Sequence, residues 1–134
     1  MIQFEIDGDP QGKQRPRHAR TGAVYTPTET KAYERKVAWQ FWNTKPKPET
    51  YHGAVAMEIV AYYRIPASAG KAAAQMMRDG ERVPAKKPDI DNVVKIVMDG
   101  LNKNAYDDDR QVVQVTARKA YADEPKVVVK VWEI

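Results

Sequence analysis

The stretch from residue 54 to residue 63 limits the possible folds more than any other feature of the chain. In an extended strand, successive side chains point to opposite faces of the sheet. One face would carry the larger apolar side chains, which are Val55, Met57, Ile59, Ala61 and Tyr63. The other face is nearly as apolar, because it carries Ala54, Ala56 and Val60. A strand that is apolar on both faces is typical of the centre of a sheet, so we expect this strand to be central.

The pattern around this strand predicts one α+β domain over residues 1–134, in the order β-α-β-α-β-β, with one further short helix as an insertion-like element. The expected strands cover residues 2–7, 54–63, 111–121 and 126–134, and the expected helices cover residues 28–43, 68–78 and 90–102. Thr28 or Thr30 is a suitable N-cap for the first helix, and Ser68 for the second. Pro46 prevents the first helix from continuing much beyond Asn43. The last two strands are expected to form an antiparallel hairpin.

Residues 86–112 contain six aspartates, although the chain has a net charge of +4. They are Asp89, Asp91, Asp99, Asp107, Asp108 and Asp109. Like charges this close repel one another unless a cation or basic side chains neutralise them. A basic chain with one concentrated acidic segment is typical of a metal-dependent enzyme that acts on nucleic acid, because the metal ion lets a phosphate approach the carboxylates.

The first part of the acidic segment predicts an amphipathic helix. Apolar residues recur from Ile90 to Leu101 at the spacing of one helix face. The opposite face carries a polar ridge, made of Asp91, Lys95, Asp99 and Asn102. Asp89 lies at the start of the helix, where the helix dipole favours a carboxylate. Capping of the helix would explain either Asp89 or Asp91 alone. It does not explain both, because one N-cap needs only one side chain.

The second part, Asp107–Asp109, lies where the chain enters the strand expected from Gln111. If that strand lies beside the helix, oxygen ligands from both elements converge on one site, which suits Mg²⁺ and Mn²⁺. Alternate strand residues point apart, so Asp107 and Asp109 would share a direction and Asp108 would not. Each of the three is equally explained as a solvated aspartate of a turn, and both interpretations stay open.

Residues 13–20 carry four cations, which are Lys13, Arg15, Arg17 and Arg20. Pro16 blocks a helix in this segment. The cations predict either a solvated basic loop or an arm that contacts phosphates, because they repel one another until an anion neutralises them. Lys86 and Lys87, directly before the acidic helix, are further candidates for phosphate contacts.

Composition excludes several kinds of site. The chain has no cysteine, which rules out disulfides, thiolate nucleophiles and cysteine-bound zinc, and two histidines disfavour a histidine-rich metal site. Residues 89–92 begin like an EF-hand calcium loop, but Val94 stands where that loop needs glycine and Gly100 where it needs glutamate. No apolar run is long enough for a membrane span and no signal peptide is evident, so we expect a cytoplasmic protein without a membrane partner.

The run PDIDNVVKIVMDGLN, followed by YDDDRQV, resembles the signature of the RusA family of Holliday-junction resolvases. The shared pattern is D-x-D-N-x-x-K, then D-x-L-N, then D-D-x-Q-V, in that order. The similarity is densest over residues 87–119. It continues more loosely into the N-terminal half, where GKQRPR, the YTP at Tyr25–Pro27 and the helix start at Lys31–Val37 are similar to longer family members.

The resemblance implies a small homodimeric endodeoxyribonuclease that uses Mg²⁺, with Mn²⁺ as a substitute, to cut four-way or other branched DNA. It also implies an α+β fold around a mixed four-stranded sheet. The family's catalytic and metal-binding positions match Asp89, Asp91 and Asp109 as carboxylates and Lys95 as the lysine, with Asp99 and Asp108 at other recurrent positions. The additional Asp107 departs from the pattern, so it leaves open which aspartates of the triplet meet the metal.

Two alternatives to junction cleavage stay open. A metal-dependent nuclease of this kind could act mainly on flaps or forks, because DNA structure is recognised by shape and not by a short motif. A non-catalytic module could instead bind branched DNA and use the aspartates for structural ions. Lys95 argues against that module, since its positive charge would repel a bound cation. A purely structural role for Lys95 also stays open, because it could form an ion pair with Asp91 or Asp99.

Overall fold

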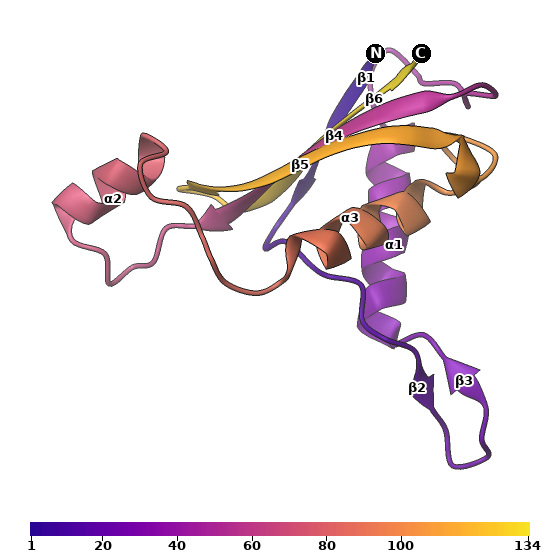
Figure 1. The fold of residues 1–134 in the computed structure, drawn as a ribbon, viewed down its shortest axis with the longest axis horizontal. Coiled ribbons are helices and arrows are strands. Elements are labelled where there is room, and N and C mark those ends of the chain that lie inside the picture. The colour runs from indigo at the N-terminus through magenta and orange to yellow at the C-terminus, as the bar shows by residue number, and fades with distance from the viewer.

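The computed structural model describes residues 1–134 and contains the expected mixed four-stranded sheet (Figure 1). The strands are β1 (Ile2–Asp7), β2 (Arg17–His18), β3 (Val24–Tyr25), β4 (Val55–Arg64), β5 (Val112–Ala122) and β6 (Lys126–Glu133). The helices are α1 (Thr28–Trp42), α2 (Lys71–Arg78) and α3 (Ile90–Leu101), with a short 3-10 turn, η1 (Asp109–Gln111), before β5. The predicted fold class is confirmed.

The four long strands lie in the order β1-β6-β4-β5. β4 pairs antiparallel with β6 and parallel with β5, so the prediction of a central strand is correct. The predicted antiparallel hairpin of the last two strands is wrong, because β4 lies between β5 and β6 and these two strands do not pair. A parallel pair needs a crossover, and here the crossover contains α2 and α3. This topology places the two acidic segments in one unit, at the two ends of the same crossover helix.

Helices α1 and α3 cover the same face of the sheet, and α3 runs below β5 (Figure 1). The hydrophobic core lies between these helices and the inward faces of β1, β4 and β6. Its largest fully buried side chains include Phe41 of α1, Met57 and Ile59 of β4, and Ile96 and Leu101 of α3. No helix is long and apolar enough to cross a membrane.

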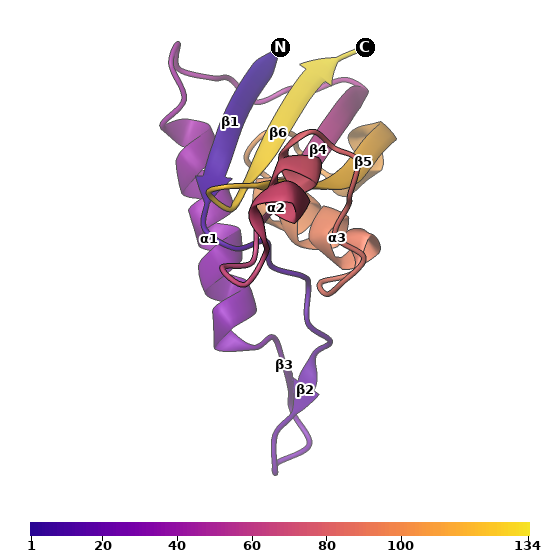
Figure 2. The same ribbon diagram turned by 90° about the vertical axis from the view of Figure 1, so that its left-hand side faces the viewer.

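The basic segment forms a β-hairpin where the sequence predicted only a loop. β2 pairs antiparallel with β3, with Arg17 opposite Tyr25 and His18 opposite Val24. The hairpin projects away from the sheet, on the side opposite both chain termini (Figure 2). Pro16 directly precedes the two-residue strand, a position where proline is tolerated, so its presence blocks a helix but not this short ladder.

The predicted N-cap residues of two helices are wrong. α1 begins at Thr28 with Pro27 as its N-cap residue, so Thr28 and Thr30 both lie inside the helix. α2 begins at Lys71 after Gly70, three residues beyond the predicted cap Ser68. Proline and glycine without a capping side chain occupy these N-cap positions, so the usual hydroxyl signal points to the wrong residue.

Candidate active site

The polar ridge of α3 is present as predicted. Val93, Ile96, Val97 and Leu101 are fully buried against α1 and the sheet. Asp91 and Lys95 are therefore exposed on the other side, while Asp99 and Asn102 are half-buried near the end of the helix. Burial of the apolar stripe thus fixes the direction in which these four polar side chains point.

Asp89 occupies the N-cap position of α3, but its side chain accepts no capping hydrogen bond. The capping explanation therefore does not account for its carboxylate. Tyr63 of β4 lies nearby, and its hydroxyl donates a hydrogen bond of 2.8 Å to the carbonyl oxygen of Pro88. Burial raises the pKa of Tyr63, and the negative charge of Asp89 adds to this increase. β4 thus anchors the backbone directly before Asp89.

The three consecutive aspartates have three different environments. The Asp107 carboxylate contacts Nδ1 of His52 at 2.8 Å. The Asp108 carboxylate accepts a hydrogen bond from the backbone N–H of Arg110 and caps η1. Asp109 is the member whose carboxylate has a buried oxygen, Oδ1, without a hydrogen-bond partner. Because these residues precede and form a 3-10 turn, the alternation expected for a strand does not apply to them.

The Asp109 carboxylate lies in an unfavourable environment for a negative charge. Burial raises its pKa, and the charges of Asp99 and Asp108 raise it further, whereas Tyr106 and Lys95 oppose the shift. Tyr106 itself is fully buried, and its hydroxyl donates to the carbonyl oxygen of Met98 at 2.7 Å. A cation beside Asp109 would relieve both the charge repulsion and the unpartnered oxygen.

Lys95 forms no ion pair in the structure, so its structural explanation as a partner of Asp91 or Asp99 is not realised. Asp99 instead pairs with Lys13, whose ammonium lies 3.0 Å from Asp99 and 2.5 Å from Glu34 of α1. Lys13, which the sequence predicts to contact DNA, thus links α1 to α3. Its positive charge is already shared between two carboxylates.

The predicted carboxylates do not form one group in this structure. Asp109 lies near Asp99 and Lys95, towards the C-terminal part of α3, whereas Asp89 lies near Tyr63 at the N-terminal end. No three histidine or acidic side chains are placed together so that they could hold a metal ion. The assignment of Asp89, Asp91 and Asp109 as metal ligands stays a prediction, and the orphaned oxygen of Asp109 is the structural feature that fits a cation.

A polar cavity of about 560 Å³ lies at the N-terminal end of α3. It is lined by residues 10–14 and by Lys87, Pro88, Asp89 and Asn92. Gly12 allows the two segments to approach, because a Cβ at this position would lie 2.9 Å from Pro88 Cβ and 3.1 Å from Asn92 Cβ. Lys87 and Asp89 therefore share one water-accessible site beside the acidic helix, a combination suited to an anion held near a carboxylate-bound cation.

The predicted DNA-contacting cations have different surroundings. Arg15, Arg17 and Arg20 are exposed on or beside the hairpin and form no ion pair. The Lys86 ammonium lies 5.7 Å from the centre of the Tyr121 ring, a cation–π distance. The hairpin therefore presents three free guanidinium groups to the solvent.

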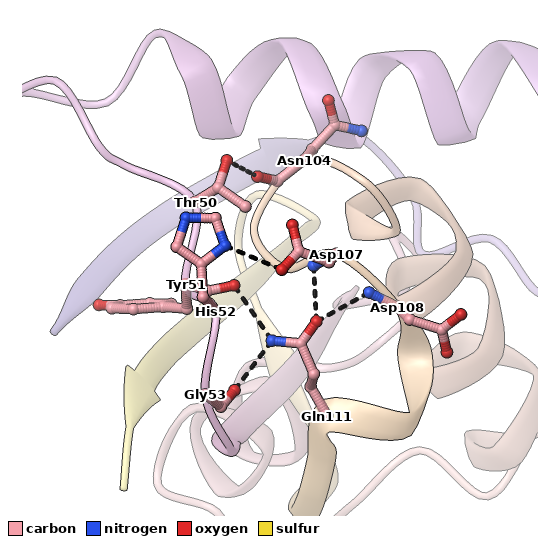
Figure 3. A network of polar contacts seen from close by, with 8 residues as sticks. All are labelled: Thr50, Tyr51, His52, Gly53, Asn104, Asp107, Asp108 and Gln111. Carbon is pink, nitrogen blue, oxygen red and sulfur yellow. Dashed lines mark hydrogen bonds and ion pairs between the residues drawn. The ribbon is translucent and has the colours of Figure 1, made fainter.

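Sequence reasoning missed three supporting residues. It assigned no role to His52 or Tyr63, and it noted Gln111 only as part of a motif. Gln111 links the turn before β5 to the segment before β4 through four hydrogen bonds (Figure 3). Asp108 followed three residues later by Gln111 is a capping-box pattern, so the two local partners were predictable, whereas the carbonyl groups at 51 and 53, about 60 residues away, leave no local signal.

Comparison with known proteins gives two findings. The family model described as "Endodeoxyribonuclease RusA" matches residues 7–132, nearly the whole chain. The protein YqaN of Bacillus subtilis (strain 168), itself uncharacterized, is 36% identical over 139 residues, which cover 99% of this chain and 96% of YqaN.

Proposed function

Because the chain belongs to the RusA family of endodeoxyribonucleases, we propose that it is a Mg²⁺-dependent enzyme that resolves four-way DNA junctions by paired, symmetric nicks. The family match over residues 7–132 is the observation that carries this proposal. The free carboxylate of Asp89, the orphaned oxygen of Asp109 and the unpaired Lys95 support it, since each of these groups is left without a structural partner.

Asp89, Asp91 and Asp109 are proposed to hold the metal, with Mn²⁺ as a substitute for Mg²⁺. A bound divalent cation supplies Lewis-acid polarisation of the scissile phosphate and lowers the pKa of a water. The proposal requires Asp89, Asp91 and Asp109 to come together around the metal, because no three acidic side chains are placed so that they could hold an ion in this structure. Asp99 and Asp108 act around them, Asp99 by its charge and Asp108 by capping η1.

Lys95 is proposed as the residue that stabilises developing negative charge on the phosphate or orients the attacking water. It lies one helical turn from both Asp91 and Asp99 and is exposed without a partner. A positive charge that is already in position when negative charge develops is a strong catalytic device.

The phosphate backbone is proposed to lie across the hairpin and the N-terminal end of α3. Arg15, Arg17 and Arg20 supply free cations on one side, and Lys86 and Lys87 flank the acidic helix on the other. Lys13 contributes mainly by neutralising Asp99, because its ammonium is paired there. A four-way junction has near two-fold symmetry, so two related nicks call for a homodimer with one active site in each protomer.

The decisive experiment incubates the protein with a labelled synthetic junction, with and without Mg²⁺, beside fork, flap and linear duplex substrates. We expect paired nicks in the junction that require the metal. Asp91→Asn should abolish cleavage and still bind the junction, whereas the control Glu124→Gln, which changes an exposed acid in the turn between β5 and β6, should cut normally.

Each alternative has its own signature in this experiment. If the protein cuts forks or flaps faster than junctions, its main substrate is a fork or a flap and not the junction. Tight junction binding without any metal-dependent cleavage would identify a binding module. Normal cleavage by Asp91→Asn would remove that residue from the metal site.

A further inference from the structure

The Gln111 side chain uses both ends of its amide to connect two loops that lie far apart in the sequence (Figure 3). Its Nε2 group donates to the carbonyl oxygens of Tyr51, at 3.1 Å, and Gly53, at 2.9 Å. Its Oε1 atom accepts from the backbone N–H groups of Asp107, at 2.7 Å, and Asp108, at 2.9 Å. An amide side chain has two N–H donors and one oxygen with two lone pairs, so its hydrogen-bonding capacity is fully used.

The residues that make these four bonds lie on both sides of Asp109 in the sequence. Two of the bonds hold the backbone of the residues directly before it, and the Gln111 side chain itself begins two residues after it. The Asp108 carboxylate completes a reciprocal capping arrangement with the same turn. The backbone that carries Asp109 is therefore held on both sides, although Gln111 makes no contact with the Asp109 carboxylate.

The other end of the connection is rigid. The N–H of Tyr51 donates to the carbonyl oxygen of Ala105 at 2.8 Å, and Thr50 Oγ1 donates to the carbonyl oxygen of Asn104 at 2.7 Å. Gly53 lies two residues before β4, the central strand of the sheet. Gln111 thus connects the turn that carries Asp109 to the segment that leads directly into β4, the most deeply buried strand.

We propose that Gln111 is a positioning residue that holds the Asp109 carboxylate in the orientation needed to receive the divalent cation. The inference rests on the proposed metal-dependent function. These backbone bonds fix the position of the turn from which the Asp109 side chain extends, and in this position one carboxylate oxygen is buried without a hydrogen-bond partner.

The test compares Gln111→Met, which keeps the length of the side chain and removes all four hydrogen bonds, with Gln114→Met. Gln114 is an exposed glutamine of β5 without a side-chain hydrogen bond, so it is a matched control. Mn²⁺ affinity is measured by titration calorimetry on the protein without DNA. We expect about 10–100-fold weaker Mn²⁺ binding in Gln111→Met, as for other residues that orient metal ligands, and no change in Gln114→Met.

Cleavage supplies a second measurement. In Gln111→Met, kcat should fall at low Mg²⁺ and recover as Mg²⁺ is raised, while the Kd for junction DNA stays constant. Loss of the four hydrogen bonds lowers the melting temperature in either case, whereas a merely structural role would leave the Mn²⁺ affinity of the folded variant unchanged and give no recovery of kcat at high Mg²⁺. If Gln111→Met does not fold, Gln111→Asn is measured instead. It keeps the amide on a shorter side chain, and its Mn²⁺ affinity is expected to be lower than that of the wild type.

Unchanged Mn²⁺ affinity in folded Gln111 variants would overturn the inference, and so would a wild-type protein that binds no Mn²⁺. If the wild-type protein binds Mn²⁺ but cuts no DNA, the proposed function fails separately. The comparison of Mn²⁺ affinities then still decides the role of Gln111.

Discussion

Replacing Gly100 with alanine tests the contact between α1 and α3 that orients the acidic ridge. A Cβ at position 100 would lie 2.8 Å from Val37 Cβ, 3.0 Å from Val37 Cγ1 and 3.0 Å from the carbonyl oxygen of Glu34. Two of these atoms belong to or directly adjoin the α1 backbone, so they cannot turn away as the end of a long side chain can. The two helices must therefore separate by several tenths of an ångström to accept the methyl group.

Two opposing effects decide the sign of the change. Alanine in a helix interior is more favourable than glycine by about 1 kcal/mol. Inserting a methyl group into a closely packed interface costs about 1–3 kcal/mol. Because Val37 is fully buried and the clash involves backbone, we expect the upper part of that range and a net loss of about 1–2 kcal/mol in the free energy of unfolding.

Urea unfolding followed by circular dichroism measures this loss. With a slope of about 2 kcal/mol/M, the midpoint should fall by roughly 0.5–1 M while the slope stays unchanged. Gly70→Ala is the control, because no atom lies within 4 Å of its added methyl group. The free energy of unfolding should fall by only about 0.5 kcal/mol in this variant, since alanine is a poorer N-cap residue than glycine. A Gly100→Ala variant as stable as the wild type would refute the close helix contact described here.

Three further predictions concern the site. Lys95→Met should abolish cleavage and leave junction binding and unfolding free energy near wild type, since Lys95 has no structural partner; a parallel loss of stability would contradict this. Tyr63→Phe removes one hydrogen bond to Pro88 and should lower the unfolding free energy by about 1 kcal/mol in urea titrations. The Asp107 carboxylate raises the pKa of His52, so any stability that protonated His52 contributes is present below its unfolded pKa of about 6.5 and is lost as pH rises through the higher folded pKa. NMR titration should find a lower His52 pKa in Asp107→Asn than in the wild type.

The strongest sequence patterns predicted the framework of the fold. The two-sided apolar pattern of residues 54–63 identified the central strand, because the side chains of a central strand are flanked on each side by those of a neighbouring strand. The apolar stripe from Ile90 to Leu101 identified α3 and the direction of its polar ridge. Both patterns reflect burial, which is the largest contribution to the stability of the fold.

Features that depend on contacts between distant segments could not be predicted. The hairpin of β2 and β3 has no apolar alternation, because nearly all of its side chains are exposed, so its ladder left no periodic signal. The different hydrogen-bond partners of Asp107, Asp108 and Asp109 depend on a histidine from another loop and on a local turn. The pairing of Lys13 with Asp99 and Glu34 arises only when α1 packs on α3.

The crossover from β4 to α3 contains an arm, residues 65–88, that is fastened at its base and at one side. Tyr63 and Lys119 hold its returning end through the carbonyl oxygens of Pro88 and Lys86, and Arg78 pairs with Asp123. Gly80, at the turn after α2, has φ +81°, which would strain a side chain there, but Glu81 beside it is exposed and its side chain makes no hydrogen bond or ion pair. Lengthening or labelling the arm at this turn leaves the register of the sheet untouched, so a fluorophore placed there would report how near the arm comes to bound DNA without disturbing the chemistry.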